Sequence, residues 1–142
     1  TRRSSDLYSG VDSYMKNVVE KANADGYVET MFGRRRNLPE LTSSKHMIRA
    51  FGERVARNMP IQGTAADIIK IAMIKVDERM KAENLRARLV LQVHDELIVE
   101  APQDESMRVA LIVQEEMENA VKMSVPLTAD AAIGRTWYDA KG

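Results

Sequence analysis

Residues 88–100 constrain the fold of this chain more than any other stretch. A run of strand-like composition ends at Val93, the polar pair His94-Asp95 follows, and a second apolar run occupies residues 97–99. Two such runs around a short polar break predict a β-hairpin with a two-residue turn. These turns prefer Asn-Gly or Asp-Gly because the central residues often need a positive φ. His-Asp is a poor turn pair, and a locally unfavourable residue at a tight turn is where function is expected.

The predicted turn carries one imidazole and two carboxylates, those of His94, Asp95 and Glu96, to the same tip. A plain acidic surface turn would have the same composition, because short motifs match by chance. The pattern alone therefore leaves a functional and a structural interpretation open.

Length and composition predict one globular domain over residues 1–142, with a sizeable core. The chain has no cysteine, which excludes disulfides and thiolate chemistry. No apolar run approaches membrane-spanning length, so we expect no membrane partner and a cytoplasmic location. The net charge of zero hides a division: residues 1–58 hold 11 Lys/Arg against 7 Asp/Glu, and residues 59–142 hold 10 against 14. A basic first part and an acidic second part are compatible with holding a polyanion near a cation site.

The first half of the chain predicts a helix over residues 8–24 that ends at Gly26, then short strands at 27–30 and 37–38. Residues 32–36, which include three consecutive arginines, are predicted to form a turn between these strands. The arginines are either a solvated turn or a set of phosphate contacts, and their mutual repulsion favours a nearby anion.

A helix is predicted to follow from residue 42 and to break or kink at Pro60, which lacks the N–H and clashes with the preceding turn. Arg54 and Asn58 share one face of that helix, and Gln62 extends the row if the kink allows it. Such a row suits hydrogen bonding to nucleic-acid bases or sugars, although a plain polar face has the same pattern. Beyond Pro60 we predict a helix over 64–82, the hairpin, a helix over 102–121 and a third strand over 125–133. Helices and strands without βαβ alternation predict an α+β fold, a small antiparallel sheet covered by helices on one face.

The sequence LQVHDELIVEAP closely resembles the third polymerase motif of family A DNA polymerases, the bacterial DNA polymerase I type. The runs ERVARNMPIQGTAAD (53–67), GYVETMFGRRR (26–36) and residues 134–141 are similar to blocks of the same family, in order and over essentially the whole chain. The resemblance implies the C-terminal part of the polymerase palm with the base of the fingers.

The activity that this resemblance implies is template-directed transfer of deoxynucleotides to a primer 3′ end, with two Mg²⁺ ions and primer-template DNA and deoxynucleoside triphosphates as partners. In-line phosphoryl displacement needs cations at the attacking and leaving oxygens, and Mg²⁺ prefers carboxylate oxygens. Asp95 matches the metal-ligating, catalytic aspartate of the motif, Glu96 the neighbouring catalytic acid, and His94 a residue close to the primer end.

Arg54, Asn58 and Gln62 match residues that in the family touch the new duplex from the minor groove, and Arg36 is the arginine of the triplet expected to reach DNA. The minor groove presents acceptors at similar places in every correct pair, so these donors test geometry without reading sequence.

The family's first-motif aspartate and its nucleotide-binding helix are expected upstream of Thr1, so the resemblance implies that this chain alone is inactive. Two alternatives stay open: a non-catalytic duplex DNA-binding module, and a single-subunit RNA polymerase. Glu96 after His94-Asp95 favours a DNA polymerase, because those RNA polymerases usually carry serine there. A bacterial, nucleoid-associated role in replication or repair would follow.

Overall fold

The computed structural model describes residues 8–141 and divides the chain into two compact units, one up to Ala65 and one from Ala66. Helix α3 is continuous across this division. The expectation of a single domain over residues 1–142 therefore stays a prediction. The two units are described separately below.

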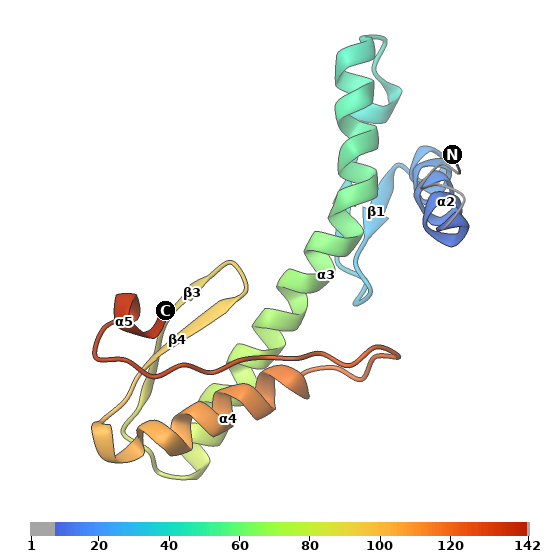
Figure 1. Ribbon diagram of the computed structural model, residues 1–142. Helices are drawn as coiled ribbons and strands as arrows, with labels where there is room; N and C mark the ends of the chain where they lie inside the picture. The colour runs from blue at the N-terminus through green and yellow to red at the C-terminus, as the bar shows by residue number, and fades with distance from the viewer. Residues whose placement is uncertain (1–7, 142) are drawn as a thin grey trace, which may run out of the picture. The chain divides into compact units, whose positions relative to one another are not determined.

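The first unit is built on helix α2 (Ser9–Asp25) and a ribbon of two antiparallel strands, β1 (Tyr27–Glu29) and β2 (Arg35–Asn37). Gly26 ends α2 in the left-handed region with φ 78°, and its N–H donates to the carbonyl of Ala22, as predicted from the glycine. A 3-10 helix, η1 (Pro39–Thr42), leads into the first part of α3 (His46–Ala82). Figure 1 shows the ribbon beside α3.

The core of this unit comes from all of these elements. Its buried apolar side chains are Ala22, Val28, Leu38, Leu41 and Ala56. Gly52 lies on α3 where η1 approaches it: a Cβ there would lie 3.1 Å from the Leu41 Cδ2 and 3.2 Å from the Leu41 backbone N. The glycine thus permits a close contact that its position in the middle of a helix did not reveal.

Of the predicted break or kink at Pro60, the break is wrong, because α3 runs through this proline without interruption, and the kink stays a prediction. Proline inside a helix costs about 3 kcal/mol, so contacts elsewhere must hold the helix together. Before Pro60, Ala56 is fully buried and Val55 and Met59 pack against the core. After it, Thr64 accepts a hydrogen bond from the Met31 N–H in the loop between β1 and β2. Tertiary packing therefore outweighs the local preference.

The second unit holds the predicted hairpin. Strands β3 (Arg88–Val93) and β4 (Glu96–Glu100) pair antiparallel, and Val93 pairs with Glu96 across the two-residue turn. The register shifts between Leu89 and Leu91, which leaves Val90 as an extra residue in a β-bulge. The 3-10 helix η2 (Gln103–Glu105), the helix α4 (Ser106–Glu118) and the short α5 (Trp137–Lys141) complete the unit.

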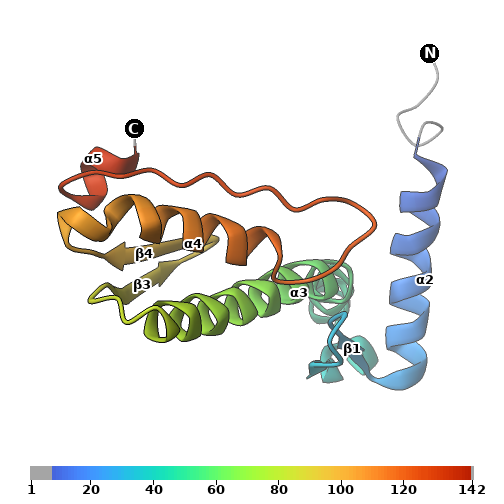
Figure 2. The same ribbon diagram turned by 90° about the horizontal axis from the view of Figure 1, so that it is seen from below.

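One face of this hairpin is covered by helices, as Figure 2 shows for α4 and the second part of α3. The buried side chains between them are Val76, Met80, Ala87, Val109 and Ile112. Helix α4 ends at Glu118, earlier than predicted, where the Lys75 ammonium donates to the carbonyls of Asn119 and Ala120. A cation at a helix C-terminus satisfies its free carbonyls.

The predicted third strand over residues 125–133 is wrong: that part of the described chain is extended but pairs with no strand. Pro126 cannot donate to a ladder, and the Ala129 N–H donates instead to the Glu118 carboxylate. The α+β class is confirmed, with two separate two-stranded sheets in place of one. None of the helices in residues 8–141 is both long and apolar enough to cross a membrane.

Candidate nucleic-acid and metal site

The His94-Asp95 turn is an acidic corner at the tip of the hairpin. His94 has φ 51° and is one of two described non-glycine residues with a positive φ. The φ of Asp95 is not positive. A turn with a positive φ at its first central residue only is a type II′ turn, which usually has glycine at that position. A residue with a Cβ there is less stable by about 1–2 kcal/mol. The Gln92 amide donates to the His94 carbonyl at 2.6 Å and holds the turn. The unfavourable turn predicted from the sequence is therefore present.

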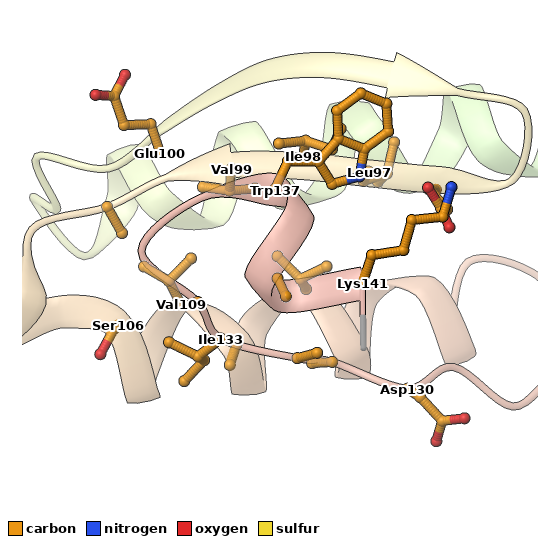
Figure 3. Close-up of a pocket in the computed structure, with 18 of the residues that line it drawn as sticks. Leu97, Ile98, Val99, Glu100, Ser106, Val109, Asp130, Ile133, Trp137 and Lys141 are labelled. Atoms are coloured by element: carbon orange, nitrogen blue, oxygen red, sulfur yellow. The ribbon is translucent and has the colours of Figure 1, made fainter.

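The side chains of this corner face solvent to different extents. His94 and Asp95 are exposed, and Glu96, the first residue of β4, is half-buried. Asp95 and Glu96 line a cavity of about 680 Å³ between β4, α4 and the last segment of the chain (Figure 3). The same cavity is also lined by Trp137 on α5 and by Leu97 on β4. An exposed carboxylate at a tip is free to take a ligand, whereas one under apolar side chains would not be.

The donor set of the corner fits Mg²⁺ in chemistry and only partly in number. Carboxylate oxygens suit this ion, which keeps several of its waters and is bound through one or two carboxylates. Within residues 8–141 no group of three or more His, Asp or Glu side chains is placed to hold a metal ion. The prediction that Asp95 and Glu96 belong to a cation site therefore stays a prediction.

The polar row on α3 forms, with Arg36, one groove in the first unit. Arg54, Asn58 and Gln62 lie along its helix wall, Arg36 comes from β2, and the volume is about 420 Å³. Among residues 8–141 no acidic residue lines this groove, and all four polar side chains are exposed. The structure thus brings Arg36, which lies far from the helix row in the sequence, into one groove with Arg54, Asn58 and Gln62.

The three arginines of the triplet differ in their contacts. Arg34 donates to the Gly63 carbonyl at 3.2 Å. Arg35 pairs with Glu29 at 3.1 Å and lies 4.4 Å from the centre of the Tyr27 ring. Arg36 makes no hydrogen bond or ion pair with the residues that the structure describes. Arg35 and Arg36 also lie on β2 and not in the predicted turn. Arg36 is therefore the arginine whose charge is available to a partner.

Known proteins match these features. The sequence profile described as DNA polymerase family A matches residues 3–139. The chain belongs to this family. It is 55% identical to DNA polymerase I of Bacillus caldotenax and 54% identical to that of Geobacillus stearothermophilus, in each case over 134 residues, 94% of this chain and 15% of the relative. The chain thus spans about 15% of the length of these curated relatives.

A solved structure supports the same assignment. The POL domain of Pol1 from M. smegmatis, in complex with DNA primer-template and dNTP, matches with a TM-score of 0.93 and 48% sequence identity. The match covers 97% of this chain and 24% of that chain. The family predicted from the motif and the α+β class of a family A polymerase palm are confirmed. The roles of the individual site residues stay predictions.

Proposed function

We propose that this chain is the part of a DNA-directed DNA polymerase that contacts the primer terminus and the newly formed duplex. The parent protein would transfer deoxynucleotides to a primer 3′ end under the direction of a template. The family match and the relatives named DNA polymerase I support this proposal. The observation that carries it is the exposed Asp95 carboxylate at the tip of a tight turn. A bacterial, nucleoid-associated role in replication or repair follows from it.

In the proposed site Asp95 is the catalytic metal ligand and Glu96 is an auxiliary acid. Two bound Mg²⁺ ions would stabilise charge on the attacking and leaving oxygens. His94 lies beside Asp95 and would contact the primer end, and the Gln92 amide fixes the carbonyl of this turn. A rigid turn restricts the positions that the Asp95 carboxylate can take, which is what a site for in-line displacement needs.

The groove on the first unit would hold the minor-groove side of the duplex. Arg54, Asn58 and Gln62 supply donors to the acceptors that every correct base pair presents there. Arg36 would contact a phosphate or sugar, because its charge is unpaired among the described residues. The described residues that line the groove include no acidic one, which favours a polyanion.

We also propose that the 142-residue chain alone does not polymerise. A two-metal site needs more carboxylate ligands than Asp95 and Glu96 provide. Primer extension with the isolated chain tests this point. Sustained incorporation would contradict it.

The proposed function is tested in a chimera in which this chain replaces the matching 134 residues of the Geobacillus DNA polymerase I. Primer extension and primer-template affinity are measured for the chimera and for its Asp95→Asn variant. We expect extension to fall by about 100- to 1,000-fold, the scale on which lost electrostatic stabilisation reduces kcat, with affinity retained. Asp104→Asn, a change at an exposed carboxylate on η2, is the matched control.

Two results would contradict the proposal. Unchanged extension in the Asp95→Asn chimera would favour the non-catalytic duplex-binding module. An inactive parental chimera that also fails to bind primer-template would exclude both functions.

A further inference from the structure

The loop between β1 and β2 is joined to α3 by a small set of contacts within the first unit. The Met31 N–H donates to the Thr64 hydroxyl at 2.9 Å, and the Arg34 guanidinium donates to the Gly63 carbonyl at 3.2 Å. Thr30, 4% exposed, accepts hydrogen bonds from the backbone N–H groups of Phe32 and Arg34, each at 3.2 Å. The loop is thereby fixed both internally and against the helix.

Gly63 allows this approach because it has no side chain. A Cβ at this position would lie 2.8 Å from the Thr30 Cγ2, closer than real Cβ atoms come. Any larger residue would push the loop away from α3. A glycine inside a helix costs about 1 kcal/mol against alanine, so its presence is explained by the contact and not by helix propensity.

The same contacts determine the width of the groove described above. Gly63 adjoins Gln62 on the helix wall and itself lines the groove. Arg34 precedes Arg36 by two residues, and Arg36 is paired in register with Val28 on β1. Movement of the loop would therefore move Arg36 relative to the polar row on α3.

We propose that Thr30, Gly63 and Thr64 are positioning residues that set the distance between Arg36 and the Arg54–Asn58–Gln62 row, so that both contact one duplex at once. This inference rests on the proposed function. It adds that the affinity for primer-template depends on three residues outside the set predicted to touch DNA. Arg36 and the row are held on different elements, which the shared core of Val28, Leu38 and Ala56 joins at one end of the ribbon and the loop–helix junction joins at the other.

The test uses the chimera described under Proposed function, with Gly63→Ala, Thr30→Ser and the double variant. Serine keeps the hydroxyl that accepts from Phe32 and Arg34 but removes the Cγ2 that an alanine at position 63 would meet. The dissociation constant of a matched primer-template is measured against salt concentration by fluorescence anisotropy. Thr42→Val is the control, because the Thr42 hydroxyl donates to the Pro39 carbonyl in η1 and does not line the groove.

For Gly63→Ala we expect the dissociation constant to rise about tenfold, the equivalent of one lost hydrogen bond to a charged group. The slope of log affinity against log salt should fall by about 0.9, because one phosphate contact, that of Arg36, is lost. Thr30→Ser alone should bind like the parent, and the double variant should recover both the affinity and the slope. A loss of folded protein alone would lower the affinity without changing the slope.

Three outcomes would overturn the inference. Gly63→Ala could keep the parental affinity and salt slope, Thr30→Ser could fail to restore the affinity that Gly63→Ala loses, or Thr42→Val could lose as much affinity as Gly63→Ala. If Gly63→Ala does not fold, Thr64→Val and Thr64→Ser decide with the same measurements, since only serine keeps the acceptor for the Met31 N–H. Equal binding of these two variants would again overturn it. Failure of the parental chimera to bind DNA would overturn the proposed function and this inference together.

Discussion

Gly134→Ala should release α5 from the second unit. A Cβ at residue 134 would lie 2.5 Å from the Ala140 backbone N and 2.9 Å from the Asp139 carbonyl carbon. Ordinary contact begins at 3.4 Å, so the backbone of α5 would have to retreat by roughly 0.9 Å. Both atoms belong to the main chain, so no side-chain rotation relieves the contact.

The cost of this substitution follows from how α5 is held. Thr136 and Asp139 form a reciprocal cap: the Asp139 carboxylate accepts from the Thr136 N–H and hydroxyl, and the Asp139 N–H donates to that hydroxyl. A forced shift of a packed element costs typically about 1–3 kcal/mol, and the cap is worth about 1 kcal/mol. Because the forced shift costs as much as the cap contributes or more, we expect α5 to detach and the rest of the second unit to keep its structure.

The assay uses the single tryptophan of the chain, Trp137, which lies on α5 and is 43% exposed. In Gly134→Ala its emission should shift to the red and its quenching by acrylamide should increase, with the far-UV circular dichroism of the rest retained. Gly10→Ala is the matched control, because no atom of the described residues lies within 4 Å of a Cβ there. Parental emission and quenching in Gly134→Ala would refute the reasoning.

Three further substitutions test the local arguments by urea unfolding. Glu105→Ala should lower the free energy of unfolding by about 1–2 kcal/mol, because the Glu105 side chain is 13% exposed and accepts hydrogen bonds from two backbone N–H groups just before β3. The control is Asp104→Ala, which should change this free energy by less than about 0.5 kcal/mol, because the Asp104 side chain is 72% exposed. His94→Val should cost about 1–2 kcal/mol at φ 51° and His94→Gly should not; equal stability of the two would contradict the positive φ. Gly52→Ala should destabilise α3 despite the better propensity of alanine, because the Leu41 backbone N lies 3.2 Å from the new Cβ; a gain in stability would show that η1 yields.

Sequence reasoning located the features that depend on local chemistry. The hairpin, its two-residue turn and the positive φ at His94 follow from an alternating pattern and an unfavourable turn pair. The end of α2 at Gly26 follows from the conformational freedom of glycine. The membership of the four groove residues in one site came from the resemblance, and the structure shows that they share a groove.

Features that depend on contacts between distant residues could not be predicted in this way. Pro60 breaks an isolated helix, and only the packing of Ala56 and the loop contact at Thr64 explain why α3 continues. The apolar run over residues 125–133 has the composition of a strand, but it pairs with no strand in the described chain, and composition alone does not supply a pairing partner. Gly63 resembles any glycine in a helix until Thr30 is seen against it.

The central claim is that the Asp95 carboxylate binds a divalent cation at the primer end, and metal rescue of Asp95→Cys in the chimera tests it most directly. This chain has no cysteine of its own, so the new side chain is its only thiolate ligand. We predict no extension with Mg²⁺ and partial recovery when Mn²⁺ or Cd²⁺ replaces it. Extension at the parental rate with Mg²⁺, or no recovery with either softer ion while primer-template binding persists, would contradict the account.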